Sequence, residues 1–180
     1  MADAEITTQY QVERRGFLHP EHHVRSAEGP VGVLTWTRGK GMVVGGRWSP
    51  VSGEVVTLRR DPGLLRSQFS LWTEGQEWLG SSLRGHFLRR EILLHTGSRP
   101  LRMLPLREFQ SGWVLQAPKT GDMARFRLPL LSQAGHIEVY RKLEFELVVF
   151  AYFLAAQLRL ESLWPGPVEA AGRSAARLAG

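Results

Sequence analysis

The feature that most constrains the fold is an apolar segment near the C-terminus, from Leu143 to Leu160. No charged residue occurs between Leu147 and Ala156, and drawn as a helix the segment has apolar side chains on every side. A helix that is apolar all round must be enclosed by protein or by lipid. The uncharged run is well short of the roughly 20 residues that span a hydrocarbon core. We therefore expect a helix enclosed by protein, and no transmembrane segment.

Local signals predict that this helix covers residues 145 to 163. Glu144 and Glu146 lie at its start, where carboxylates complement the positive end of the helix dipole, and Arg159 lies in the last turns. Pro165-Gly166-Pro167 follows, and proline cannot continue the hydrogen-bond ladder.

From Tyr10 to Ile137 the chain consists of short apolar segments separated by turn residues. The alternating residues of Val31–Trp36 are typical of a strand that a glycine turn ends. Glycine-containing turns at Thr73–Gln76, His95–Ser98 and Ala117–Gly121 predict three hairpins. Roughly a dozen short strands at close, even spacing favour a sandwich or a barrel over alternating β-α units.

The strands can provide the enclosure that the apolar helix requires. A helix apolar on all sides needs a complete wall, and a sheet of that many strands tends to curl or close. We predict a mainly β fold, a closed antiparallel β-barrel of about twelve strands around a central hydrophobic C-terminal helix. The single domain is expected over residues 10–164, with flexible ends at residues 1–9 and 165–180.

The composition gives weaker constraints. The formal net charge of +6 comes almost entirely from arginine, which is consistent with an anionic partner but also with a bias of genome composition. The sequence contains no cysteine, which removes disulfides and thiolate metal sites and suits a reducing cytoplasm. We expect a cytoplasmic protein, with peripheral membrane association as an alternative.

Three turns and the helix together resemble a known family. The turns Ser26–Gly29, Thr73–Gly75 and Lys119–Gly121, followed by an apolar helix that ends at Trp164, resemble the tubby C-terminal-like superfamily. This group includes tubby domains, the plant LURP-one-related proteins and the phospholipid scramblases. The resemblance covers residues 10–164 and implies a barrel of about twelve strands around a C-terminal helix.

The chain departs from this family at its functional motifs. It has neither the cysteine cluster that scramblases use for lipidation nor an acidic segment with calcium-loop spacing. The basic positions with which tubby domains hold a phosphoinositide have no match here. The resemblance therefore assigns no ligand-binding residue to this chain.

A group of arginines is the first candidate site. The apolar residues of segment 123–128 are expected to face inward, so Arg125 and Arg127 face outward. With Arg59 and Arg89 they would form a basic outer patch for phosphates or lipid headgroups. The alternative is scattered charge that only keeps the protein soluble.

The second candidate is a buried ion pair. If Leu88, Ile92 and Leu94 face the core, Arg90 faces it too. A buried guanidinium needs a partner, and Glu146 is the charge nearest the apolar part of the helix, so we predict an ion pair between Arg90 and Glu146. The alternative is that Arg90 extends to the barrel rim.

Metal and catalytic motifs are weak. The segment His19–His23 contains three imidazoles and a carboxylate, but Pro20 prevents helical spacing and neighbours on a strand point to opposite faces. We interpret it as a solvated loop and predict no metal or cofactor. No serine has the glycine pattern of a nucleophile elbow, so no catalytic residue is assigned. No helix follows Gly45-Gly46, which we interpret as hairpin glycines and not as a phosphate loop.

These observations lead to two functional expectations. The first is a non-catalytic binding module of the tubby and scramblase-like type, for an anionic lipid headgroup, a membrane surface or a protein partner. The alternative is a small-ligand-binding protein or an enzyme, with its pocket at the mouth of the barrel. Nucleic acid is not expected, because no motif of basic residues interleaved with aromatic ones stands out.

Overall fold

The computed structural model describes residues 7–16, 20–39, 42–62, 68–84, 90–97, 99–106, 111–129, 132 and 134–159. Within these ranges the chain forms twelve strands followed by one helix. The elements are β1 (Thr8–Arg15), β2 (Glu21–Ser26), β3 (Gly29–Gly39), β4 (Met42–Pro50), β5 (Val56–Arg60), β6 (Phe69–Thr73), β7 (Trp78–Leu83), β8 (Ile92–His95), β9 (Pro100–Pro105), β10 (Gly112–Ala117), β11 (Gly121–Arg127), β12 (Ala134–Val139) and α1 (Phe145–Gln157).

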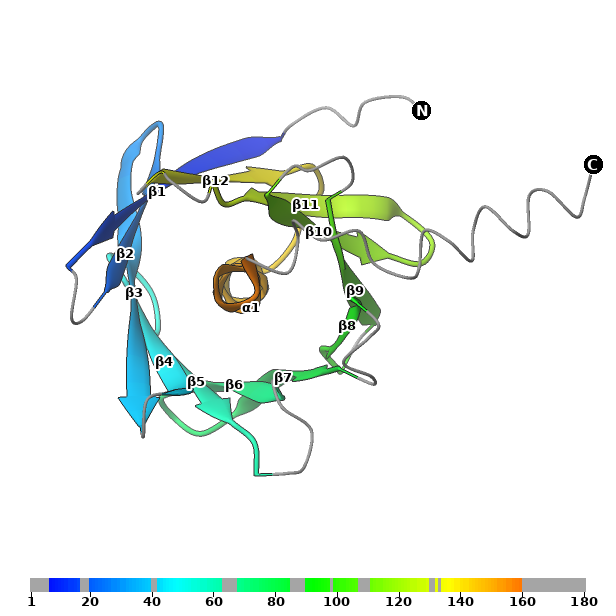
Figure 1. The fold of residues 1–180 in the computed structure, drawn as a ribbon, viewed down its shortest axis with the longest axis horizontal. Helices are drawn as coiled ribbons and strands as arrows, with labels where there is room; N and C mark the ends of the chain where they lie inside the picture. The colour runs from blue at the N-terminus through cyan, green and yellow to red at the C-terminus, as the bar shows by residue number, and fades with distance from the viewer. Residues whose placement is uncertain are drawn as a thin grey trace, which may run out of the picture.

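The strands form a closed barrel. Each pairs antiparallel with its neighbours in the chain, and β1 pairs with β12 to complete the circle. Figure 1 looks along α1, which runs through the middle of this wall. Closure leaves no strand edge exposed, and it confirms the predicted barrel around a central helix.

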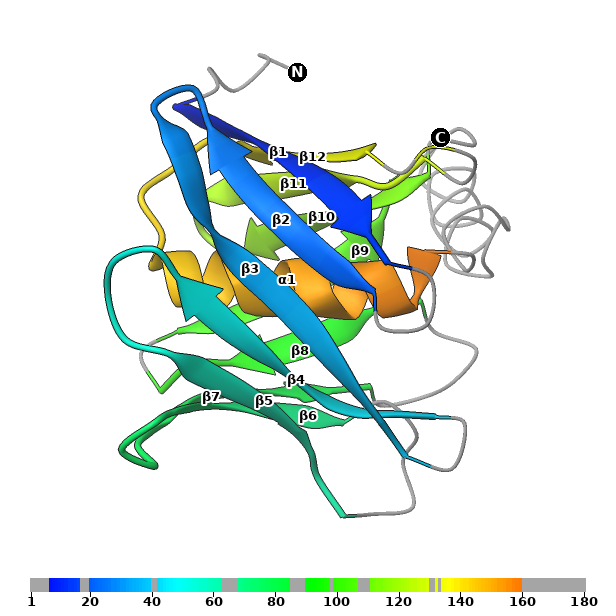
Figure 2. The same ribbon diagram turned by 90° about the vertical axis from the view of Figure 1, so that its left-hand side faces the viewer.

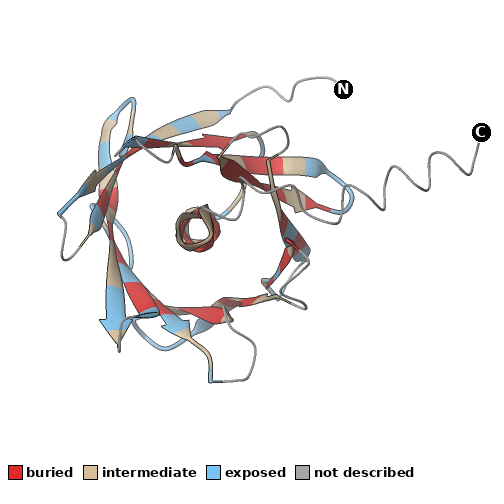
Figure 3. Cartoon of the chain, in the orientation of Figure 1, coloured by how far each residue is buried: buried red, intermediate tan, exposed pale blue. Residues whose placement is uncertain are grey.

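The central helix is buried on every side. Nine consecutive residues, Leu147–Ala155, are buried, and Figure 3 shows buried residues on the helix and around the wall that faces it. The helix begins at Phe145, as the sequence predicts, with Glu146 in its first turn. It ends at Gln157, earlier than the sequence predicts, because the backbone of Leu158 has left helical geometry. Residues 160–163 of the predicted helix lie outside the described residues.

Aromatic side chains fill the space between helix and wall. The Phe153 ring lies 5.7 Å from the Trp36 ring and 5.2 Å from the Phe69 ring, measured between centroids. At the start of the helix, the Phe145 ring lies 4.9 Å from that of Tyr10. Such contacts add to the free energy gained by removing each ring from water.

One glycine marks a close approach of helix and wall. Gly46 lies inside β4, opposite Trp36 and Leu58, so the interpretation of Gly45-Gly46 as hairpin glycines is wrong. A Cβ atom at Gly46 would lie 2.7 Å from the carbonyl oxygen of Thr35 and 3.0 Å from the Phe153 ring. The position therefore holds glycine because a larger residue would collide with the packed core.

Two of the three predicted hairpin turns lie wholly within the described residues, and both are present; the third, between β8 and β9, includes Ser98, which lies outside them. Thr73–Gln76 connects β6 to β7, and Gln76 adopts a positive φ of 66°. Ala117–Gly121 connects β10 to β11, with Gly121 at a φ of 75°. These turns lie at the barrel end where α1 begins, whereas β1, β3 and β5 finish at the end where α1 finishes (Figure 2).

We predict that Leu154→Ala lowers the free energy of unfolding by about 2–5 kcal/mol, because it opens a cavity in an enclosed site. Leu154 is 1% exposed. The matched control is Leu93→Ala, since Leu93 is 37% exposed on β8 and its truncation is expected to cost less than about 1 kcal/mol. Urea unfolding of both variants measures the difference, and equal losses would contradict the enclosure of α1.

Candidate functional site

The inward-facing rows of three strands end in arginine. Side chains on a strand alternate between its two faces, so a residue two positions after a buried one faces the same way. Arg14 follows the buried Val12 by two positions in β1. Arg38 in β3 and Arg60 in β5 have the same place, each two positions after an inward-facing residue. All three therefore lie on the inner side of the wall at the end where α1 finishes.

These arginines line a cavity. Its volume is about 420 Å³, and Arg159, just after α1, is the fourth arginine in its lining. Among the described residues that line it, none is acidic. The apolar part of the lining consists of Pro20, Trp36, Met42, Val43, Phe69 and Ala156.

Acidic partners do not neutralise the strand arginines. Arg14, Arg38 and Arg60 form no ion pair with any acidic residue of the described ranges. The guanidinium of Arg60 instead contacts the sulfur of Met42, at 3.8 Å. The pocket consequently combines several positive charges with an apolar surface, an arrangement that suits an anion with an apolar part.

His22 lies in the same lining. It pairs with Arg14 in the register of β1 and β2, and is 6% exposed. Its Nδ1 lies 2.7 Å from Oη of Tyr152, and its ring centroid lies 4.0 Å from that of Trp36. Burial lowers the pKa of His22 to about 3, and the positive charges of Arg14 and Arg159 act in the same direction. His22 is therefore neutral at physiological pH.

The neighbouring groups respond to the same environment. Burial raises the pKa of Tyr152, so its phenol stays protonated. Burial also lowers the pKa of Arg159, and the positive charge of Arg14 lowers it further. Arg14 thus acts on both His22 and Arg159, which indicates that these groups surround one region of the pocket.

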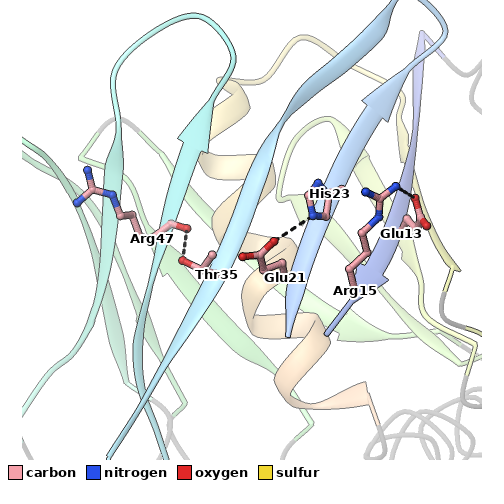
Figure 4. A network of polar contacts seen from close by, with 6 residues as sticks. All are labelled: Glu13, Arg15, Glu21, His23, Thr35 and Arg47. Atoms are coloured by element: carbon pink, nitrogen blue, oxygen red, sulfur yellow. Dashed lines mark hydrogen bonds and ion pairs between the residues drawn. The ribbon is translucent and has the colours of Figure 1, made fainter. Parts of the chain in front are cut away.

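The outer face of the same strands has a different charge pattern. In Figure 4, Arg15 donates to Glu13 at 2.9 Å, and the imidazole of His23 lies 3.1 Å from the carboxylate of Glu21. On the outer face of β1 and β2 these basic side chains therefore have acidic partners, whereas Arg14 on the pocket side of β1 has no acidic partner among the described residues.

The structure does not bring the predicted basic patch together. Arg59 lies on β5, whereas Arg125 and Arg127 lie on β11, and five strands separate β5 from β11 in either direction around the barrel. The two groups are therefore on opposite sides of the molecule. Arg89 lies outside the described residues.

The two β11 arginines do point outward, and both have acidic neighbours. Arg127 forms an ion pair of 3.1 Å with Glu138, whose other carboxylate oxygen accepts a hydrogen bond from Tyr140 at 2.7 Å. Arg125 lies 3.7 Å from Asp122. Much of the positive charge of this group is thus already balanced.

Arg90 is buried, as the alternation in its segment predicts, with 9% of its surface exposed. Glu146 is half-buried in the first turn of α1. No hydrogen bond or ion pair between the two is among the contacts of the described residues. Their pairing stays a prediction.

The interpretation of the histidine segment as a solvated loop is wrong for its described part, because His22 and His23 lie in β2, on its two faces. His22 faces inward and His23 outward, while His19 lies outside the described residues. Within the described ranges, no group of three or more histidine or acidic side chains is placed to hold a metal ion. The helix of the described chain is also too short and insufficiently apolar to cross a bilayer.

The sequence reasoning missed Arg14, Arg38 and Arg60, although a signal for them exists. Each continues the every-second-residue row of apolar side chains at the end of a strand. The same alternation correctly indicated that Arg90 is buried. Comparison of the chain with protein-family models, with curated proteins and with solved structures found no match. The resemblance to the tubby-like superfamily stays a prediction.

The depressed pKa of His22 predicts how stability depends on pH. Below pH 6.5 the unfolded chain protonates this imidazole, but the folded protein does not until about pH 3. In this window only the unfolded state binds the extra proton. The free energy of unfolding therefore decreases as the pH is lowered, by about 2 kcal/mol from pH 6.5 to pH 5.

His22→Gln is expected to remove this component of the pH dependence in urea unfolding experiments. His23→Gln is the control, since His23 faces outward beside Glu21. An unchanged slope in His22→Gln would contradict a buried, neutral His22.

Proposed function

We propose that the protein binds a small anionic molecule with an apolar part, in the pocket between the end of α1 and strands β1–β6. The observation that carries this proposal is a cavity of about 420 Å³ with four arginines and no acidic residue among the described residues of its lining. The volume falls within the roughly 300–1,000 Å³ of ordinary ligand pockets.

The charge and accessibility of the strand arginines support ligand binding. Arg14 and Arg60 are half-buried and Arg38 is exposed, so a ligand can reach their guanidinium groups, and none of the three pairs with an acidic residue of the described ranges. An anion would balance their charge, and the planar fork of arginine suits the oxygens of a carboxylate or phosphate. Trp36 and Phe69 provide flat surfaces for the apolar part of the ligand.

The proposed role is binding, as in the first expectation from the sequence. The proposed site is a pocket at the mouth of the barrel, as in the alternative expectation. The headgroup of an anionic phospholipid has the same chemistry and stays within the proposal. A cytoplasmic location and peripheral membrane association stay predictions. No observation in the described residues favours a protein partner over a small molecule.

We predict that anilinonaphthalene sulfonate, a fluorescent dye with an anionic and an aromatic part, binds the folded protein with an affinity that falls as salt is added. Arg14→Gln and Arg159→Gln should each weaken binding about tenfold or more, because a hydrogen bond to a charged group contributes roughly 1.5–3 kcal/mol. Fluorescence titration measures both effects.

The matched control is Arg47→Gln, which removes an arginine from the outer face, where it pairs with Glu74. This variant should bind the dye like the original protein. A double variant that combines Arg14→Gln with Arg159→Gln and binds the dye as tightly as the original protein would contradict the proposed site. The absence of dye binding by the original protein would also contradict it.

A further inference from the structure

The contact between His22 and Tyr152 determines what the pocket presents to a ligand. His22 lines the pocket, while Tyr152 is 1% exposed and lies behind it on α1. Their contact, Nδ1 to Oη, is short at 2.7 Å. Either the phenol donates its hydrogen to Nδ1, or a protonated Nδ1 donates to the phenol oxygen. The two arrangements leave different groups at Nε2, the other ring nitrogen.

The burial of Tyr152 decides between them. Its hydroxyl has no second hydrogen-bond partner among the described residues. If Nδ1 were the donor, the hydroxyl hydrogen would be left without an acceptor in a buried place, which is costly. The phenol therefore donates to Nδ1, and the proton of the neutral imidazole lies on Nε2. His22 is thus an uncharged hydrogen-bond donor in the pocket lining.

Positive charges surround this donor. Arg14 of β1 is the register partner of His22, and Arg159 follows the end of α1. His23 is the next residue of β2 and faces outward, and on β3 the ring of Trp36 packs against that of His22. Arg14 and Arg159 both lower the pKa of His22, and Arg14 lowers that of Arg159. Two guanidinium groups and one neutral N–H donor therefore lie around one part of the pocket.

A single group with two negative charges matches this set better than a group with one. A phosphomonoester carries a charge of about −1.5 to −2 at pH 7 and offers three acceptor oxygens, whereas a sulfonate or a carboxylate carries one charge. We propose, as a refinement that rests on the proposed function, that the anionic head of the ligand is a phosphomonoester held by Arg14, Arg159 and the Nε2 hydrogen of His22. Tyr152 positions that hydrogen. Trp36 and Phe69 then contact the body of the ligand.

Calorimetric titration with phenyl phosphate and benzenesulfonate tests this inference, because both probes have the same ring and differ in the charge of the head. Since His22 stays neutral, any pH dependence belongs to the phosphate, whose second pKa is about 6. The affinity for phenyl phosphate should rise about tenfold from pH 5 to above pH 7 as the dianion forms. Benzenesulfonate should bind more weakly, and equally at each pH.

Variants test the His22–Tyr152 pair. His22→Gln places an amide N–H near the position of Nε2 and should keep the preference for phenyl phosphate, whereas His22→Ala should lose it. Tyr152→Phe frees the imidazole to adopt either tautomer and should weaken phenyl phosphate binding more than dye binding. Dye binding and urea unfolding show that each variant is folded. An unchanged phosphate preference in both His22→Ala and Tyr152→Phe would overturn the role of the pair.

The remaining outcomes separate this inference from the proposed function. Equal, pH-independent affinities for the two probes would overturn the phosphomonoester but leave an anion pocket. If neither probe nor the dye binds, both proposals fail.

Vesicles distinguish a lipid source of the phosphomonoester from a soluble one. Phosphatidic acid carries a phosphomonoester headgroup, and phosphatidylglycerol carries a diester with one charge. Preferential sedimentation with phosphatidic acid vesicles supports a lipid-borne head, whereas phenyl phosphate binding without vesicle binding supports a soluble ligand. Equal sedimentation with both lipids would count against the inference.

Discussion

The apolar surface of α1 points in every direction, and the wall of strands is what keeps it from water. Leu147–Ala155 are buried without interruption, so the helix cannot rest on one face of a sheet. Only a closed wall of strands covers every side of the helix, and the pairing of β1 with β12 closes that wall. The dependence is mutual, because a barrel of twelve strands without a filled interior would contain a large void. Helix and wall must therefore form together.

The same geometry produces the pocket. The helix ends at Gln157, and the inward rows of β1, β3 and β5 end in arginines that line one pocket together with its last turn. Those positions lie on the inner side of the wall, half-buried in β1 and β5 and exposed in β3, and all three hold arginine. Proteins break the local rules of their fold mainly at functional sites. The inward arginines are such a departure, and the proposed anionic ligand would compensate for it.

The barrel could be predicted from the sequence because its signals are local. The apolar run fixes the helix start at Phe145, and glycine turns separate the strands. The requirement for glycine at Gly46 could not be predicted, because it comes from a helix more than a hundred residues away in the chain. The contact of His22 with Tyr152 likewise joins residues 130 positions apart. Alternation within β1 does indicate that Arg14 faces inward, but only strand register places it beside His22.

Native-state hydrogen exchange of the α1 amides tests most directly whether helix and wall form one cooperative unit. If they do, the amides of Val148–Ala155 exchange only when the whole protein unfolds, and their free energy of opening equals the global free energy of unfolding. A helix that is peripheral, or that leaves the barrel by itself, would show opening free energies lower than the global value by about 2 kcal/mol or more. A helix and wall that form together give the first result, and the second result would contradict their cooperativity.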